Sequence, residues 1–344
     1  YDQSTAISPM SSVGSRQPGS RSLAIVLALS VAACTDSGEA TPDAGESDAR
    51  IDAAAGDPSV LVGSFQVVLV PPDTASATPG YTRVVGKVYD GPTPAQLVWE
   101  ESRTAGECRL LEPRVPFCSK PCENGSVCVE DGKCQAYPAS QVVGTVKVTG
   151  IRTEAGATEF SMEPIANSYQ PPAGTSLPYP AFAENDTIRF EASGSSFTAP
   201  FTLQANGIGP LELANDTIPL EQGKAVMLSW SPPGEGVASQ IQVKLDISHH
   251  GGTKGMIQCE ATDDGSLELA ATLVTDLLNL GVAGFPTIVI SRSAVGSATI
   301  VSGRVDLVVA SQIEREVEIP GLDSCDDNED CPKGETCQPD LTCK

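Results

Sequence analysis

The sequence predicts a mainly β protein, with antiparallel β-sandwich-like domains and small disulfide-rich modules. Among 344 residues there are 32 glycines and 27 prolines but only 5% aromatic residues, a profile typical of short strands joined by many turns. Apolar and polar residues alternate in many short stretches, which is the period of a half-buried strand. Most of the eleven cysteines form two groups of four with regular spacing, and such groups in exported chains form disulfides.

The N-terminal segment has the three parts of a secretory signal. Arg16 and Arg21 precede the apolar run Leu23–Ala33, which ends in small residues. The run has 11 residues, whereas about 20 are needed to span a bilayer of roughly 30 Å. We therefore expect residues 1–33 to be a signal peptide, with translation starting at Met10.

Cys34 follows Val31-Ala32-Ala33 directly, and this junction resembles the lipobox of bacterial lipoproteins. The resemblance implies that Cys34 is acylated and becomes the first residue of the mature chain. The whole layout resembles uncharacterised lipoproteins of Gram-negative bacteria that carry small four-cysteine modules. It implies an exported, lipid-anchored protein of the cell envelope, at the outer membrane on its periplasmic face or at the cell surface. An ordinary secretory signal with a chance cysteine is the alternative.

Residues 34–59 are expected to be a lipidated cysteine followed by a disordered acidic tether. Positions 35–59 hold seven acids and a single arginine, with almost nothing to bury. Removal of residues 1–33 takes away Asp2, Arg16 and Arg21, so the net charge changes from −23 to −24. So acidic a chain repels nucleic acid and anionic lipid headgroups, which excludes both as electrostatic partners.

Residues 60–183 are expected to form a first β domain with a cysteine-rich insert at 106–136. A proline-rich loop at 170–180 marks its end. The stretches that read as strands are Ser64–Val70, Tyr81–Tyr89, Leu97–Trp99 and Gln141–Thr149.

Residues 184–322 are expected to form a second, sandwich-like domain, and residues 323–344 a C-terminal four-cysteine module. Ala270–Leu280 is the one convincing helix, with Gly281 as its stop. Asp263-Asp264-Gly265 lies between apolar runs and predicts a hairpin turn. The expected strands are Ile188–Ala192, Phe197–Leu203, Val226–Trp230, Ile241–Ile247, Met256–Ala261, Thr287–Ser291, Thr299–Val309 and Val317–Ile319.

Trp230 is expected in a core, because it is in phase with Val226 and Leu228. The stretch Leu228-Ser229-Trp230-Ser231-Pro232-Pro233 resembles the second strand of fibronectin type III modules. The resemblance covers six residues and lacks the usual tyrosine in the next strand, so it supports a sandwich rather than that family.

The cysteine groups predict a first-to-third and second-to-fourth pairing. Neither group can bury a core, so disulfides are required, and zinc is a poor alternative because no Cys-x2-Cys pair occurs. Cys108 and Cys259 remain outside the two groups. They either bond to each other and link the two domains, or leave Cys259 as a buried thiol while Cys108 pairs within its own group. The favoured pairs are Cys118 with Cys128, Cys122 with Cys134, Cys325 with Cys337, and Cys331 with Cys343.

Candidate reactive groups are few. His249-His250 are the two histidines, and the chain has no HExxH motif, nucleophile elbow or glycine-rich phosphate loop. Asp326, Asn328 and Asp330 begin like a calcium loop, but cysteines occupy the positions where an EF-hand needs glycine and glutamate. We therefore name no catalytic residue, cofactor or metal, and expect a solvated acidic turn at 326–330, with a looser calcium site as the alternative.

The expected function is a non-enzymatic role in binding or adhesion, with an unknown protein or glycan ligand, or a structural role in the envelope. This expectation rests on the architecture alone. A secreted hydrolase with a site that the sequence does not display is the alternative.

Overall fold

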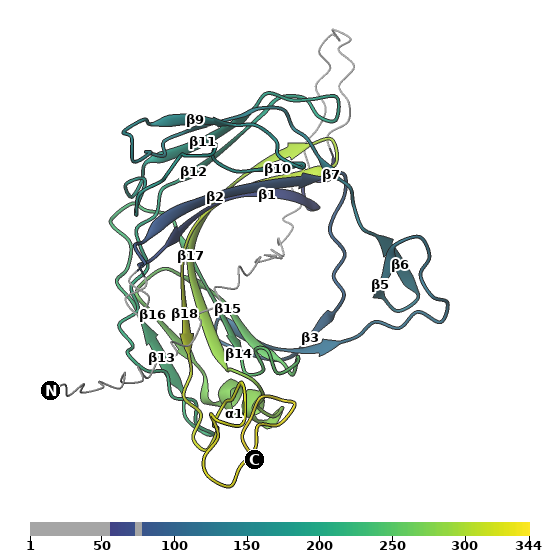
Figure 1. Ribbon diagram of the computed structural model, residues 1–344, viewed down its shortest axis with the longest axis vertical. Coiled ribbons are helices and arrows are strands. Elements are labelled where there is room, and N and C mark those ends of the chain that lie inside the picture. Colours follow the sequence, from purple (N-terminus) through teal and green to yellow (C-terminus); the bar gives the residue numbers. More distant parts are fainter. Residues whose placement is uncertain (1–55, 73–77) are drawn as a thin grey trace, which may run out of the picture.

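The computed structural model describes residues 56–72 and 78–344. The predicted signal peptide, Cys34 and nearly all of the tether lie outside these residues. The described chain is mainly β, with strands and a single helix, as the sequence predicts (Figure 1).

Ten strands form the largest sheet, which curves around the middle of the molecule (Figure 1). They are β1 (Leu61–Val70), β2 (Tyr81–Tyr89), β3 (Val98–Ala105), β4 (Cys108–Arg114), β7 (Ser140–Gln141), β10 (Ser168–Tyr169), β14 (Gln240–Asp246), β15 (Met256–Thr262), β17 (Thr287–Ile300) and β18 (Gly303–Glu316). Their order is β10-β2-β1-β18-β17-β14-β15-β4-β3, with β7 also paired to β2. The pair β1–β18 is parallel, and the other pairs are antiparallel.

Two smaller layers cover the outer side of this sheet. One is a four-stranded sheet of order β12-β11-β8-β9, and the other combines the pair β13–β16 with helix α1 (Figure 1). A third small sheet, β5–β6, belongs to the cysteine-rich insert. The bounds are β5 (Ser126–Glu130), β6 (Lys133–Ala136), β8 (Val146–Thr149), β9 (Glu159–Met162), β11 (Thr187–Ala192), β12 (Phe201–Asn206), β13 (Val226–Ser229), β16 (Ser266–Leu269) and α1 (Ala271–Asn279).

The first core lies between the four-stranded sheet and the β2, β1 and β18 part of the large sheet. Phe65 is fully buried there, and its ring centroid lies 5.5 Å from those of both Tyr169 and Phe190. Gly86 is opposite Phe65 in the β1–β2 ladder, and a Cβ at Gly86 would lie 2.2 Å from the Phe65 ring. A glycine in mid-strand is therefore explained by the ring that crosses it.

The second core lies between the β13–β16 pair with α1 and the β14, β15 and β4 part of the large sheet. Trp230 follows β13 and is buried there, 4% exposed, as its alternation predicts. Cys108 and Cys259 lie opposite each other in the β4–β15 ladder and form a disulfide, with Cα atoms 4.1 Å apart. Of the two alternatives left open by the sequence, the structure therefore has the bond.

The two cores share one sheet, so the boundary expected between residues 183 and 184 does not separate two sheets. Strand β1 pairs with β18, and β4 pairs with β15, across that boundary. The hairpin of β17 and β18 contributes side chains to both cores. Alternation within a strand predicts which face is buried but not which distant strand lies beside it.

The predicted hairpin turn at Asp263-Asp264-Gly265 is wrong. The strands on its two sides lie in different layers, because β15 pairs with β14 whereas β16 pairs with β13. Asp263 is buried, and its carboxylate binds the Arg292 guanidinium at 2.6 Å and accepts the Trp230 indole N–H at 2.7 Å. An Asp-Asp-Gly triplet has the composition of a turn, but here the carboxylate of Asp263 is buried in the core as the partner of Arg292 and Trp230.

Two expected strands are divided in the structure: Gln141–Thr149 falls into β7 and β8, and Thr299–Val309 includes the turn between β17 and β18. Other differences concern the ends of elements. The helix ends near Gly281 as expected, and Gly281 has φ +89°. Strand β12 begins at Phe201 rather than Phe197, since Pro200 has no N–H to donate to a ladder. The insert expected at 106–136 includes β4, which belongs to the large sheet.

Candidate ligand-binding face

Both cores lie on one side of the ten-stranded sheet, and the other side faces the middle of the molecule (Figure 1). We call this inner side the concave face. Its side chains alternate along each strand with the core residues, and most carry amide, hydroxyl or charged groups. Its residues include Ser64, Gln66 and Val68 of β1; Tyr81, Arg83, Val85, Lys87 and Tyr89 of β2; Gln240, Gln242, Lys244 and Asp246 of β14; Gln258, Glu260 and Thr262 of β15; Ser291, Ser293, Val295 and Ser297 of β17; and Asp306, Val308, Ala310, Gln312 and Glu314 of β18.

Register brings the polar side chains of the concave face into rows across the sheet. Gln242 is opposite Ser291, and Ser291 is opposite Gln312, so one row has an amide, a hydroxyl and an amide on adjacent strands. Opposite side chains in a sheet have Cβ atoms about 4.5–5.5 Å apart. Ser291 is buried, 6% exposed, whereas Gln242 and Gln312 are half-buried, so the row offers a ligand two amides that both donate and accept hydrogen bonds.

Charges of both signs occur along the concave face, and most of them are paired. Lys244 lies 3.8 Å from Asp246 on β14, and Glu260 of β15 is 3.5 Å from the Arg109 guanidinium. Arg83 and Lys87 on β2 form no ion pair among the described residues. The β2 end of the face is therefore the part that offers unpaired cations to a ligand.

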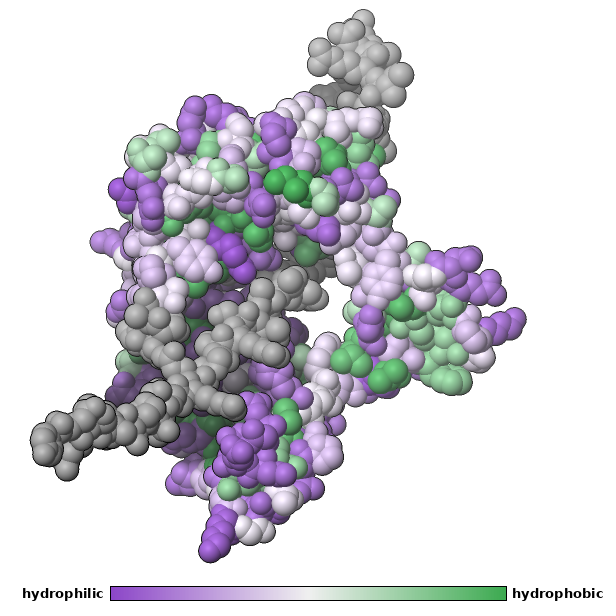
Figure 2. All heavy atoms as spheres, in the orientation of Figure 1, coloured by the Kyte–Doolittle hydropathy of each residue, from purple (hydrophilic) through white to green (hydrophobic). Residues whose placement is uncertain are grey.

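The cysteine-rich module between β4 and β7 connects the two edges of the curved sheet. Figure 2 shows an opening between this module and the rest of the molecule. On one side Gln135 donates to the Pro92 carbonyl at 2.8 Å, and on the other Arg114 binds Asp131 at 2.8 Å. The Phe117 N–H, together with the Arg114 guanidinium, lowers the pKa of the Asp131 carboxyl. These contacts attach the module beside the concave face.

Both cysteine groups have the first-to-third and second-to-fourth connectivity. The bonds are Cys118–Cys128, Cys122–Cys134, Cys325–Cys337 and Cys331–Cys343.

Each module also has a left-handed glycine three residues after its second cysteine. Gly125 has φ +72° and Gly334 has φ +104°, a conformation that side chains other than glycine adopt at a cost. The equal spacing therefore corresponds to equal topology in two modules far apart in the chain. Their sulfur atoms lie close enough to hold a metal, but disulfide sulfurs are not thiolate ligands.

The C-terminal module packs on the loop that follows α1. The Ser324 hydroxyl donates to the Gly284 carbonyl at 2.6 Å, and the Gly284 N–H donates to the Asp340 carbonyl at 2.7 Å. Cys325 is buried in this contact, 1% exposed. This module is thus held by the second half of the molecule, away from the concave face (Figure 1).

His249 and His250 lie in the turn after β14. Their ring centroids are 3.9 Å apart, and the His249 carbonyl accepts the Phe285 N–H at 2.8 Å. Burial, followed by the neighbouring His250, lowers the pKa of His249. Among residues 56–72 and 78–344, no acid or cysteine joins them in a group of three possible metal ligands.

The acidic loop at 326–330 folds on itself. Asp330 accepts the backbone N–H groups of Asp326 and Asp327 at 2.9 and 3.2 Å, which lower its pKa. Asn328 accepts the Cys337 N–H at 2.8 Å. The side-chain oxygens thus bind backbone donors of the turn, and no calcium-type group of three acids occurs among the described residues.

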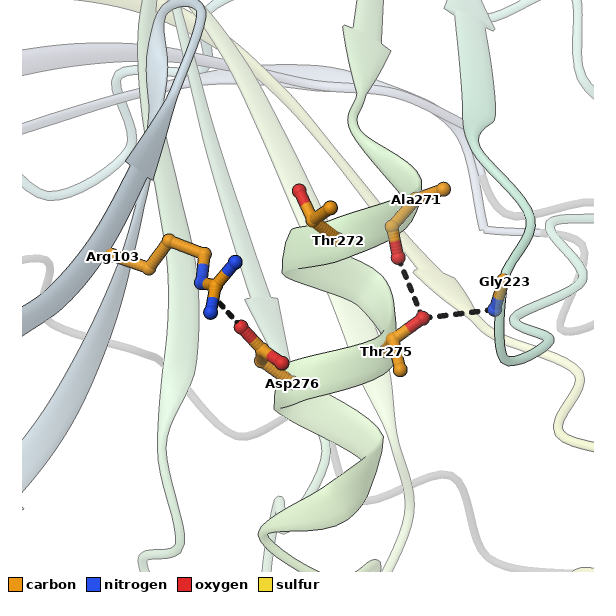
Figure 3. Close-up of a pocket in the computed structure, with 6 residues that line it drawn as sticks. All are labelled: Arg103, Gly223, Ala271, Thr272, Thr275 and Asp276. Carbon is orange, nitrogen blue, oxygen red and sulfur yellow. Dashed lines mark hydrogen bonds and ion pairs between the residues drawn. The ribbon is translucent and has the colours of Figure 1, made fainter.

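A small pocket of about 190 Å³ lies at the start of α1 (Figure 3). Arg103 binds Asp276 at 2.5 Å across it. The Thr275 hydroxyl donates to the Ala271 carbonyl at 2.7 Å and accepts the Gly223 N–H at 2.8 Å. Since these polar groups already bind each other, the pocket offers a ligand little beyond its apolar wall.

The described residues contain no helix long and apolar enough to cross a membrane. The chain matches no protein-family model, and no curated protein is significantly similar to it. The five disulfides indicate an oxidising, extracytoplasmic location. Cys34, the predicted lipidation site, lies outside the described residues.

The sequence did not identify the concave face, although a signal for it was present. Strand β2 alternates Tyr81, Arg83, Val85, Lys87 and Tyr89 with buried residues. A strand that only faces solvent usually carries small polar or charged side chains there, whereas β2 places tyrosines together with cations on the face away from the core. Recognising the rows across the sheet, however, requires the register between strands.

Proposed function

We propose that the protein is an exported, non-enzymatic binding protein of a bacterial cell envelope, anchored through Cys34, that binds a glycan along its concave face. The observation that carries the proposal is the pair of half-buried amides, Gln242 and Gln312, that flank the buried Ser291 in one row of the sheet. Sugar hydroxyls both donate and accept hydrogen bonds, and glutamine side chains match both roles.

The shape of the sheet supports binding of an extended ligand. Backbone groups of the inner strands are already paired in ladders, so side chains alone meet the ligand. Because the opposite side of the sheet is packed into two cores, these side chains are held on a rigid support. A preorganised surface loses less entropy on binding than a flexible one.

Binding fits the concave face better than hydrolysis does. The central row consists of two amides and a hydroxyl, and both histidines lie in the turn beyond β14. Neither an amide nor an unassisted serine hydroxyl is a general base. Three carboxylates of the concave face already form ion pairs, namely Asp246 with Lys244, Glu260 with Arg109, and Asp306 with Arg304. A hydrolase would be recognised by turnover of a bound polysaccharide, and such turnover would replace this proposal.

The double variant Gln242→Ala/Gln312→Ala tests the binding face. Loss of two amides should weaken binding of a neutral or acidic polysaccharide by about tenfold, since each hydrogen bond contributes roughly 0.5–1.5 kcal/mol. The measurement is calorimetry of the full chain against a polysaccharide panel. Gln204→Ala is the matched control, because Gln204 is an exposed glutamine on β12 in the covering layer. Equal binding by the double variant and the control would remove the concave face as the site.

The anchor has its own test. Wild-type protein expressed in a Gram-negative host should partition into detergent, and Cys34→Ser should move it to the aqueous phase. Thr35→Ser, one residue beyond, should partition like wild type. Wild-type protein recovered in the aqueous phase with residues before Cys34 intact would refute lipid anchoring.

A further inference from the structure

The exposed face of β2 has a composition unlike the rest of the concave face. Tyr81, Arg83, Val85, Lys87 and Tyr89 alternate with buried residues and point away from the first core. We call these five residues the β2 strip. Two aromatic rings, two cations and one apolar side chain thus lie in line on a strand near one edge of the sheet.

Neither cation of the β2 strip forms an ion pair with a described residue. Eleven of the eighteen lysines and arginines in the described ranges form ion pairs, but Arg83 and Lys87 do not. The Arg83 Nε is buried and has no hydrogen-bond partner. The Lys87 ammonium lies 5.5 Å from the centre of the Tyr89 ring.

No carboxylate stands directly across from these cations. Arg83 is opposite Val68, and Lys87 is opposite Ser64 on one side and Ser168 on the other. In a chain with 44 acidic residues and a net charge of −23, two neighbouring cations without an acid across the ladder form a locally positive site. The nearest acid in these rows is Asp306, which lies beyond Ser64 in the row of Lys87 and whose carboxylate already accepts hydrogen bonds from the Ser297 hydroxyl and the Arg304 guanidinium.

The tyrosines add a second kind of contact. Tyr81 is 45% exposed, and Tyr89 lies at the other end of the β2 strip. Arg83 and Lys87 are four positions apart on the strand, so the distance between their Cα atoms is about 13 Å. Aromatic rings stack on the apolar faces of sugar rings, and a guanidinium binds a carboxylate through two parallel hydrogen bonds. An extended chain of carboxylated sugars presents both groups repeatedly.

We infer that the β2 strip binds the acid groups of an acidic polysaccharide, one that contains uronic acids. This inference rests on the proposed glycan-binding function and specifies its ligand. Arg83 and Lys87 bind two carboxylates about 13 Å apart along the polymer, while Tyr81 and Tyr89 stack on sugar rings at the two ends. The amide row continues the same surface toward β14 and binds neutral hydroxyls.

The test compares each acidic polymer with a neutral form of the same backbone. The probes are polygalacturonate, alginate and hyaluronan, each beside its methyl-esterified form, titrated into the full chain. Wild type should bind at least one acid form about tenfold or more tightly than its ester. Arg83→Gln/Lys87→Gln should lose that difference, and Arg83→Lys/Lys87→Arg should retain most of it.

The matched control is Arg152→Gln/Lys254→Gln. It removes two other exposed cations without ion pairs, so the net charge changes equally. The control should bind as wild type does. Acid and ester forms bound equally, or no loss in Arg83→Gln/Lys87→Gln, would overturn the inference. Equal binding of single-stranded RNA would also overturn it, because the strip would then be a general anion site.

The two proposals fail separately. If neutral polysaccharides bind and Gln242→Ala/Gln312→Ala abolishes that binding, the concave face stands as the glycan site even when the β2 strip has no role. If acidic polymers bind through Arg83 and Lys87 while Gln242→Ala/Gln312→Ala binds normally, the inference about the β2 strip stands. The amide row is then not part of the binding site. If no polymer of either kind binds, both proposals are wrong.

Discussion

The outer sides of the two halves of the ten-stranded sheet are covered and stabilised in different ways. The first half is covered by a four-stranded sheet and packed with aromatic rings around Phe65, and none of the disulfides in the described chain reaches it. The second half is covered by two short strands and a nine-residue helix. Such elements are marginally stable alone. The second half instead holds a buried disulfide and a buried ion pair, Cys108–Cys259 and Arg292–Asp263.

This difference indicates that the disulfide and the ion pair supplement a covering layer that is smaller than the four-stranded sheet of the first half. The two halves differ on the concave face as well, because β2 of the first half carries two cations without an ion pair, whereas Lys244, Asp246 and Glu260 of the second half form ion pairs. One continuous sheet thus has two supports and two charge environments. The predictions below test this contrast from the largest effect to the smallest.

Removal of the core disulfide should have the largest effect. Cys108→Ala/Cys259→Ala opens a loop of 151 residues, for which chain entropy predicts a loss of about 5 kcal/mol in the free energy of unfolding. Cys331→Ala/Cys343→Ala, which opens a loop of 12 residues, should lose about 3 kcal/mol. Urea unfolding measures both. A core variant less affected than the module variant would contradict the role given to Cys108–Cys259.

The buried ion pair should come next. Asp263→Ala leaves the Arg292 guanidinium in the core without its carboxylate, and leaves the Trp230 indole N–H and Ser239 hydroxyl without an acceptor. Breaking one side of a buried pair costs about 3–5 kcal/mol. Asp264→Asn, at the exposed neighbouring acid, is the control and should change stability by less than about 1 kcal/mol. Similar losses for both variants would mean that Asp263 acts only as a turn residue.

The pH dependence of stability should separate the two halves at opposite ends of the scale. Burial raises the pKa of Tyr169 in the first core, so the unfolded chain ionises first as pH rises past about 10 and stability falls. Burial and His250 lower the pKa of His249 in the second half. The unfolded chain therefore takes up that proton first as pH falls below about 6.5, and stability falls there too.

Two variants test whether Tyr169 causes the alkaline loss of stability and His249 the acid loss. Denaturation midpoints measured from acid to alkaline pH should show a smaller alkaline loss in Tyr169→Phe and a smaller acid loss in His249→Gln. Tyr169→Phe should leave the acid loss of stability unchanged, and His249→Gln should leave the alkaline loss unchanged. A reversed assignment would show that these two groups do not report on their own halves.

Local features of the fold could be predicted from the sequence. The alternation in Tyr81–Tyr89 predicts β2 with its bounds, and Gly281 marks the end of α1. The equal cysteine gaps predict two modules of one topology, because a short segment without a core has few ways to close. These predictions depend on residues within about 20 positions of each other.

Long-range features could not be predicted. The pairing of β1 with β18 joins residues more than 200 positions apart, and nothing in either strand specifies the other. Asp263 has the composition of a turn residue, and its burial depends on Arg292 from another strand. The concave face arises from register between β2, β1, β18, β17 and β14, so it becomes visible only with the sheet in place.

Side-chain footprinting with hydroxyl radicals tests the central claim, that ligand binds on the concave face, most directly. Full-length protein is oxidised with and without polygalacturonate. The account predicts protection of Tyr81 and Tyr89, whereas Met227, which is exposed on β13 in the covering layer, keeps its oxidation rate. Protection of Phe117 and Tyr137 on the cysteine-rich module, with Tyr81 and Tyr89 unchanged, would contradict it.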